Sequence, residues 1–360
     1  MQRREFIQKT ALTGLICCTP ASLSAAPIPT TLALYDIQWS FDLSRYPTNN
    51  ISLWVPLPSD ISGFQTVLEK GSRSNATESF ETSHNRYDSR TLYAHWDTTD
   101  AAKILSLQFK VALRDRQCDF KPKRLCSDTL EQSRLFLAPS AHLPTDGAVA
   151  KAARTIVGTE KNPLKKARKI YDWIIEHSYR DESVQGCGVG SPNGMLAQLE
   201  RDGRMGGKCL DMSALCVVLM RASGIPAREV MGIRVGPSRF SSAFGAQENI
   251  TKSQHCKVEF FIETLGWIPC DPADITKLIL TEGIDQNSPR VRELANLFFG
   301  FWENNWMALN HARDFDLYPA NTQGSLDSFG YPYAEAGGEY IDPFDPSAYR
   351  YTIRSQKVLL

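Results

Sequence analysis

A cysteine stands at the start of a long apolar stretch, directly after two glycines and a lysine. Residues 210–222 contain only three polar side chains, which predicts a helix that is buried on most sides. Gly224 follows this stretch and is suited to a left-handed helix cap. Cys209 is therefore expected in the first turn, where unpaired N–H groups and the positive end of the helix dipole favour a thiolate and can hold an oxyanion.

A thiolate nucleophile needs a base, and His255 is the best placed of the few histidines. It precedes an alternation in which positions 256, 258, 260 and 262 are apolar, so His255 is expected on the other, more open face of a strand. A second strand follows the turn near Gly266 and ends at Asp271. If His255 pairs opposite Asp271, the carboxylate orients the ring to accept a proton from Cys209.

The candidate catalytic residues are thus Cys209 as nucleophile, His255 as base and Asp271 as the orienting group. Each also has a structural interpretation, as a buried thiol, a core histidine and a turn residue. The glycines before Cys209 and the strand face of His255 favour catalysis, whereas Asp271 taken alone is undecided. His311 has no second His or Cys at ligand spacing, which favours a structural hydrogen bond over a metal or second-base role. We expect no metal ion and no other cofactor.

The first 26 residues have the features of an export signal. A basic start is followed by a short apolar run that ends in small residues near 24–26, too short for the roughly 20 residues that span a bilayer. The arginine pair at positions 3 and 4, with Phe6, resembles the twin-arginine export motif. Two cysteines at 17 and 18 raise a lipoprotein interpretation, which Ile16 disfavours. We expect an exported protein, periplasmic or extracellular, without stable membrane insertion after signal cleavage.

Export into an oxidising compartment bears on the cysteines. Seven of the nine lie beyond residue 26, and an odd number leaves at least one thiol without an intramolecular partner. The candidate bridges are Cys118–Cys126, Cys187–Cys216 and, in the strand register assumed above, Cys256–Cys270. With these pairs, Cys209 is the thiol that remains.

Residues 27–135 alternate apolar and polar side chains over short spans separated by Asn, Ser, Pro and Asp. The clearest spans are "TLALYDIQWSFDL", "NISLWVPLP", "TLYAHWD" and "ILSLQFKVALRD". They predict an antiparallel sandwich or a large sheet, without a catalytic constellation.

Helical spacing begins after residue 136, with helices predicted over 146–157 and 163–178. Trp173 lies on the apolar stripe of the second helix, which favours core packing. The glycine-rich "QGCGVGSPNG" is a loop of the kind that frames a site, but lacks the Gly-Lys-Ser/Thr of a phosphate loop. We predict an α+β protein with a sandwich-like β-rich domain (27–135), a catalytic domain (136–285), and a C-terminal extension (286–360) that packs on the core and helps to frame the groove.

Charge and composition narrow the partners. The chain has 360 residues with 40 basic and 40 acidic side chains, and no long basic run. This balance disfavours nucleic acid or anionic lipid as the main partner. A hydrophobic content of 42% is enough for one substantial core or two smaller ones.

These motifs together resemble the transglutaminase-like superfamily over residues 163–275. The resemblance rests on "GGKCLDMSAL", "GIPARE" and "GWIPCDPAD", with His255 between them; "SLWVPLP" and "FGFWENNWMALNHARDFDLYP" are similar to exported bacterial members. It implies a papain-like fold with Cys209, His255 and Asp271 as the triad. No residue matches the oxyanion donor of those relatives, for which Trp173 and Gln254 are candidates. Nothing resembles the calcium sites of the animal enzymes.

The implied reaction is attack by the thiolate on an amide or peptide carbonyl to give a thioester. Resolution by water makes a peptidase or amidase, which we favour because amine transfer requires a dry acceptor channel. Resolution by a lysine amine makes a cross-linking transglutaminase. A further alternative is a non-catalytic periplasmic binding module on the same fold. The expected partner is a protein or peptide substrate, with cell-wall peptide as one candidate.

Overall fold

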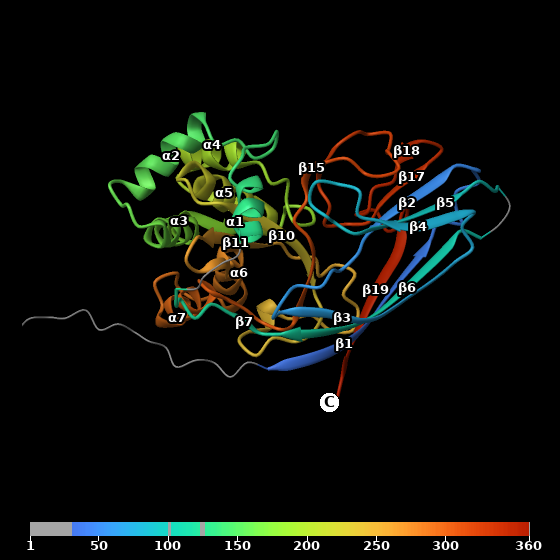
Figure 1. The fold of residues 1–360 in the computed structure, drawn as a ribbon, viewed down its shortest axis with the longest axis horizontal. Coiled ribbons are helices and arrows are strands. Elements are labelled where there is room, and N and C mark those ends of the chain that lie inside the picture. Colours follow the sequence, from blue (N-terminus) through green and yellow to red (C-terminus); the bar gives the residue numbers. More distant parts are fainter. Residues whose placement is uncertain (1–30, 100–101, 123–126, 360) are drawn as a thin grey trace, which may run out of the picture.

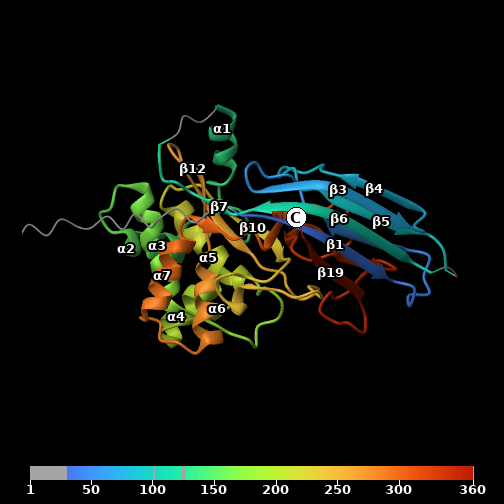
Figure 2. The ribbon, with the colours of Figure 1, turned by 90° about the horizontal axis from the view of Figure 1, so that it is seen from below.

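The computed structural model describes residues 31–99, 102–122 and 127–359. The expected signal peptide and Cys126 therefore lie outside the described residues. A helix-rich body and a β-rich body lie at opposite ends of the molecule (Figure 1), and the same division is seen after a quarter turn (Figure 2).

The β-rich body is a sandwich of two antiparallel sheets. One sheet has the strand order β19-β1-β6-β3 and the other β18-β17-β2-β5-β4. The strands of the first sheet are β1 (Leu32–Asp42), β3 (Gln65–Ser74), β6 (Ile104–Arg114) and β19 (Arg350–Val358). Those of the second are β2 (Ile51–Pro56), β4 (Glu78–Thr82), β5 (Thr91–Trp96), β17 (Tyr333–Ala336) and β18 (Glu339–Tyr340).

Alternating side chains of the two sheets meet in one apolar core. Every second residue of β1 is buried, and Trp39 packs in the same cluster as Leu53 of β2, Trp96 of β5 and Phe109 of β6. This period of two explains why the antiparallel sandwich could be predicted. The sequence did not indicate that three of its strands, β17, β18 and β19, come from the C-terminal extension.

The helix-rich body surrounds a sheet with the order β12-β11-β10-β14. Its strands are β10 (Ala227–Arg234), β11 (Lys257–Ile262), β12 (Gly266–Cys270) and β14 (Trp306–Asn310). The helices are α1 (Ser127–Leu135), α2 (Gly147–Val157), α3 (Pro163–His177), α4 (Pro192–Asp202), α5 (Cys209–Ala222), α6 (Pro272–Glu282) and α7 (Pro289–Phe298). Helices α2 and α3 match the two helices expected from the sequence. The α+β class and the transglutaminase-like arrangement of α5 and this sheet agree with the prediction.

Short elements complete the fold. They are β7 (Arg116–Gln117), β8 (Ser178–Arg180), β9 (Met205–Gly207), a 3-10 helix η1 (Ser242–Phe244), β13 (Phe301–Trp302), β15 (Arg313–Phe315) and β16 (Leu326–Ser328). The parallel pair β8–β9 leads into α5, and β7 pairs with β13 across a long separation in sequence.

The two bodies share side chains. Ile233 of β10 and Met307 and Leu309 of β14 are buried in the sandwich core, although both strands belong to the sheet of the helix-rich body. The C-terminal extension thus contributes β14 to that sheet and β17, β18 and β19 to the sandwich. In the part of the chain that the structure describes, no helix has the length and apolarity needed to cross a membrane.

Two expectations about β11 were wrong. The strand pairs with β12 so that Val258 lies opposite Cys270, two residues out of the register that would place Cys256 there. The face expected to be open is also buried, with Lys257 5% and Glu259 3% exposed. The charges on this covered face have buried partners, because Lys257 lies beside Asp271 and Glu259 pairs with two arginines.

Candidate active site

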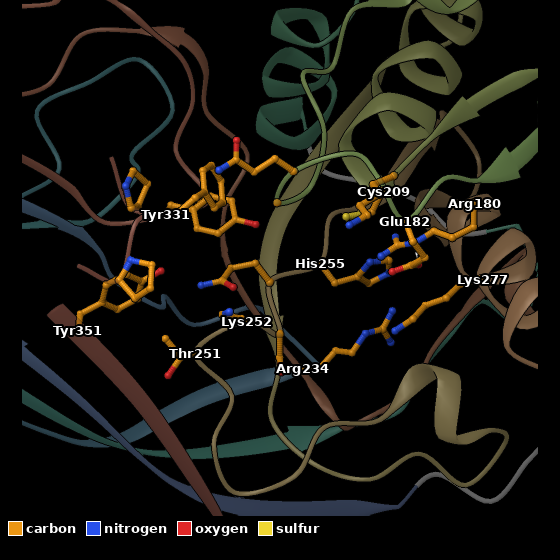
Figure 3. A pocket seen from close by; sticks show the side chains of 18 of the residues that line it. Arg180, Glu182, Cys209, Arg234, Thr251, Lys252, His255, Lys277, Tyr331 and Tyr351 are labelled. Atoms are coloured by element: carbon orange, nitrogen blue, oxygen red, sulfur yellow. Dashed lines mark hydrogen bonds and ion pairs between the residues drawn. The ribbon is translucent and has the colours of Figure 1, made fainter. Parts of the chain in front are cut away.

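Helix α5 begins at Cys209, as the sequence predicted. Its thiol lies at the base of a cavity of about 430 Å³ that is also lined by His255. Only 3% of Cys209 is exposed, because the glycine-rich loop before α4 covers one side of it. The cavity, rather than the outer surface, is therefore the route to the sulfur (Figure 3).

Asp211 fixes the glycine-rich loop to the start of α5. Its carboxylate accepts hydrogen bonds from the backbone N–H groups of Lys208 (2.9 Å), Val189 (2.9 Å) and Gly190 (2.8 Å). Burial raises the pKa of this carboxyl group, against the effect of the three donors. The sequence showed Asp211 as a polar interruption of an apolar helix, whereas in the structure it fixes the backbone on both sides of Cys209.

The helix start offers fewer free donors than expected. The backbone N–H of Leu210 donates to the carbonyl of Cys187 at 2.8 Å, so it is not available to an oxyanion. The backbone N–H of Cys209 itself remains the donor of that turn that lies next to the sulfur.

His255 is held between a backbone contact and a carboxylate. Its N–H donates to the carbonyl of Gly232 (2.9 Å), and its own carbonyl accepts from Nε1 of Trp306 (2.9 Å). The ring Nε2 lies 2.8 Å from Oδ2 of Asp271, which leaves Nδ1 to face the sulfur of Cys209. Asp271 is buried and caps α6 by accepting from the N–H of Asp274 at 3.0 Å.

A buried network of charges lies behind the imidazole. Nζ of Lys257 lies 2.5 Å from Oδ2 of Asp271 and 3.3 Å from Oδ2 of Asp274. Arg234 pairs with Asp274, which also lies 3.4 Å from Nε2 of His255. Burial raises the pKa of Asp274, but Arg234 and Lys257 outweigh it and hold that pKa well below its ordinary value.

This network contains two carboxylates and two basic side chains, so acidic and basic groups are equal in number behind the ring. Sequence reasoning missed Arg234, Lys257 and Asp274. A signal existed for Asp274, because two aspartates three residues apart around a proline mark the capped start of a helix. The other two side chains, Arg234 and Lys257, lie on strands β10 and β11, which precede Asp274 in the sequence.

Three cysteine sulfurs meet at the cavity. Sγ atoms of Cys187, Cys209 and Cys256 all lie within 4.8 Å of one another. Hydrogen bonds from the thiols of Cys187 and Cys256, and the ring of His255, hold the pKa of Cys209 well below its ordinary value, although burial raises it. The sulfur is therefore favoured as a thiolate.

The disulfides expected in this region do not form in the structure. Cys187, Cys216, Cys256 and Cys270 are all unbridged and buried. Cys256 lies beside Cys187 because the register of β11 is shifted, and Cys270 instead interacts with Cys216. The third expected pair includes Cys126, which lies outside the described residues.

Folding brings together ligand-type side chains that the sequence separates. Besides the three thiols, His255 groups with Asp271 and Asp274, and His142 groups with Asp314 and Asp327. The absence of clustered ligands, inferred from spacing, was thus incorrect as a premise. At the His255 group, the direct contacts of Lys257 and Arg234 disfavour a metal ion by charge repulsion.

The two candidate oxyanion side chains differ in position. Trp173 stacks on His177 with ring centroids 4.6 Å apart and is not among the residues that line the cavity. Gln254 does line it, and its buried Oε1 has no hydrogen-bond partner among the described residues. His311 lies in another hollow, with Nε2 3.4 Å from Nη1 of Arg228.

The far wall of the cavity is built by the C-terminal extension. It contributes Tyr331, Pro343, Phe344, Pro346, Tyr349 and Tyr351. Figure 3 shows Cys209 and His255 on one side, with Tyr331 and Tyr351 across from them. The hydroxyl of Tyr331 also reaches Sγ of Cys187 at 3.3 Å, so this wall contacts the thiol group directly.

A papain-like core with a cysteine at a helix start and a histidine on the adjoining sheet defines a class of protein. The model of the transglutaminase-like superfamily matches residues 150–272, which include all three candidate catalytic residues. Residues 150–272 therefore form a transglutaminase-like core.

Relatives extend the similarity beyond the core. An uncharacterized protein of Haemophilus influenzae is 35% identical over 371 residues, covering 97% of this chain and 99% of the relative. A candidate cysteine protease from Cytophaga hutchinsonii has a similar fold, with a TM-score of 0.50, 17% identity, and coverage of 91% of this chain and 99% of that one. The periplasmic domain of TgpA from Pseudomonas aeruginosa aligns with a TM-score of 0.35 and 13% identity over 70% of this chain and 91% of its own. A score this low supports no inference about function.

Proposed function

We propose that the protein is an exported cysteine peptidase or amidase in which Cys209, His255 and Asp271 act as a catalytic triad. The observation that carries this proposal is the arrangement of the three side chains. The thiol of Cys209 and the imidazole of His255 line one cavity, and the buried carboxylate of Asp271 lies 2.8 Å from Nε2 of that imidazole. Nucleophile, base and orienting group in that order are the parts that thiol catalysis needs.

In the first step the thiolate of Cys209 attacks the carbonyl carbon of a bound amide. His255, as an imidazolium next to two carboxylates, gives its proton to the leaving amine, and a thioester remains on the sulfur. The backbone N–H of Cys209 and the side-chain amide of Gln254 are our candidates for stabilising the oxyanion. The neutral imidazole then takes a proton from water, whose oxygen attacks the thioester carbonyl; the C–S bond breaks, the acid is released and the thiolate–imidazolium pair is restored.

The charge network explains how the imidazole can act as both acid and base. Arg234 and Lys257 hold Asp274 in its ionised form, so this carboxylate, 3.4 Å from the ring nitrogen, stabilises a positive ring without removing its proton. Because acidic and basic groups are equal in number in this network, the thiolate–imidazolium pair does not need an added counter-ion.

Alkylation at mildly acidic pH tests the proposal, with modified cysteines mapped by mass in the mature protein and in His255→Ala. An ordinary thiol with a pKa near about 8.5 reacts slowly there, whereas an imidazole-paired thiolate reacts fast. We expect selective labelling of Cys209 and slower labelling in the variant. If Cys209 is labelled no faster than the other cysteines, the proposal has no activated nucleophile and a non-catalytic binding module is favoured instead.

Turnover then distinguishes the two enzymes. The mature protein is incubated with a glutamine-containing protein and a labelled primary amine, and Cys209→Ala is the control. A hydrolase releases ammonia or cuts peptide faster than it incorporates the label, and we expect this result. Faster incorporation would make the protein a cross-linking transglutaminase instead.

A further inference from the structure

Basic side chains from four separate elements converge on the cavity that holds Cys209. Arg180 lies at the end of β8, Lys208 directly precedes α5, Lys252 lies between β10 and β11, and Lys277 is on α6. Figure 3 shows Arg180 and Lys277 beside Cys209 and His255, with Lys252 nearer the aromatic wall. Glu182 is the single acidic residue among those that line the cavity.

Not all of these cations are neutralised. Arg180 pairs with Glu182 at 2.8 Å, and Arg234, which also lines the cavity, pairs with Asp274. Among the described residues, no carboxylate lies within 4.0 Å of the amino groups of Lys208, Lys252 and Lys277. The cavity therefore has a surplus of positive charge next to the nucleophile.

Lys277 is the most informative of the three. It is half-buried on the helix that Asp271 caps, and burial, with Arg234 and Arg180 nearby, lowers its pKa to about 8. Holding an ammonium group partly out of water without a partner is costly. Such costs are typical of binding sites, where a ligand of opposite charge recovers them.

We propose that the cavity contains an anion subsite, centred on Lys277 and Lys208, that binds a carboxylate of the acyl donor close to the bond under attack. The inference rests on the proposed function and specifies its substrate class as acidic peptides or acidic amides. The aromatic wall packs against the rest of the donor, and Lys252 extends the positive charge toward that wall.

Two small alkylating agents test the subsite without a known substrate. Iodoacetate is anionic and iodoacetamide is neutral; in both cases the sulfur attacks the methylene carbon, the C–I bond breaks, iodide leaves and a thioether forms. The measured quantity is the ratio of the two second-order rate constants at Cys209, with glutathione as the free-thiol reference. A change in the pKa of Cys209 alone alters both rates equally and leaves this ratio unchanged.

We expect the ratio at Cys209 to exceed that of glutathione by about tenfold, as electrostatic focusing in a charged cleft does, and to fall toward the reference value in 1 M salt. Lys277→Met should lower the ratio several-fold. The matched control is Lys165→Met, an exposed lysine on α3 outside the cavity, which should leave it unchanged. A wild-type ratio equal to that of glutathione, or one insensitive to Lys277→Met, would overturn the subsite and leave the proposed enzyme standing.

Failure of the enzyme proposal would look different, because neither reagent would then modify Cys209 selectively.

Matched peptides provide a second measurement once a cleaved sequence is found. Replacing a glutamate near the cut by glutamine should raise KM more than it lowers kcat in the wild type, and this difference should shrink in Lys277→Met. An equal KM for both peptides in the wild type would contradict the subsite.

Discussion

Nε2 of His255 lies 2.8 Å from Oδ2 of Asp271, although their strands pair two residues away from the register that would place them opposite each other. The contact forms because Asp271 has left β12 and caps α6, so that its side chain turns back toward the ring. The pair therefore depends on a helix start rather than on a strand ladder.

Replacing this carboxylate tests the orienting role. Asp271→Asn can still accept from the N–H of Asp274, but it no longer stabilises an imidazolium or fixes its tautomer. We expect kcat/KM to fall by about 10²- to 10⁴-fold, as in other triads, with slower alkylation of Cys209. Thermal unfolding should be measured alongside, because the contact with Lys257 is also lost. Near-normal kcat/KM in a folded variant would contradict the role.

The thiol of Cys187 gives a prediction about pH. It is the largest influence that lowers the pKa of Cys209, since its S–H can donate to the thiolate. Cys187→Ala removes that donor, so the pKa of Cys209 should rise and the acid limb of the kcat/KM profile should move to higher pH. The control is Cys216→Ala. Cys216 lies on α5, as Cys209 does, but its sulfur interacts with Cys270. Equal profiles for the two variants would argue against the thiol contact.

Ionisation of Glu259 makes the stability of the folded protein depend on pH in the acid range. Burial raises its pKa, but Arg116 and Arg228, each 2.5 Å away, lower it to about 2. Because the folded pKa is depressed, the stabilisation is present above the unfolded value of about 4.5 and is lost as the pH falls toward about 2. This pKa shift corresponds to a contribution to the free energy of unfolding that is at most on the order of 3 kcal/mol.

Glu259→Gln should therefore lower the free energy of unfolding at pH 7 by about 3–5 kcal/mol, since two buried arginines lose their partner. The difference between variant and wild type should narrow as the pH falls from 4.5. Urea midpoints at several pH values measure both effects. Glu69→Gln, whose carboxylate is 68% exposed in its pair with Lys110, is the control and should cost less than about 1 kcal/mol. A difference in stability between Glu259→Gln and the wild type that stays constant with pH would contradict the role of the Glu259 carboxylate.

Gly188 tests the loop that covers the nucleophile. It has φ of 98°, and a Cβ there would lie 1.8 Å from Oδ2 of Asp211. Gly188→Ala should displace the carboxylate, free the loop and lower kcat/KM together with stability. Gly203→Ala adds a methyl group at φ of 76° with nothing within 4 Å, so it should cost only about 1–2 kcal/mol of backbone strain. If both variants keep full activity, Asp211 does not position the nucleophile.

The sequence predicted what depends on short-range pattern. Alternation in β1 and the apolar run of α5 identified the sandwich and the buried helix, and Cys209 was expected where the helix begins. The side chains around His255 were not predictable in this way, because Arg234 reaches the site from β10, across a long connection to β11, and the position of Lys257 depends on the register of the β11–β12 hairpin. The expected Cys256–Cys270 pair was wrong because a shift of two residues in the β11–β12 hairpin keeps each side chain on its face but changes its neighbour.

The last strand has a consequence for how the protein matures. Strand β19 lies beside β1, and residues 331–351 supply the aromatic wall of the cavity. A ribosome makes Cys209 well before it makes that wall, and the first sheet lacks its edge strand until residues 350–358 have been made. We infer that the cavity around the thiol is complete only after residues 331–351 have been synthesised and have packed against the earlier part of the chain.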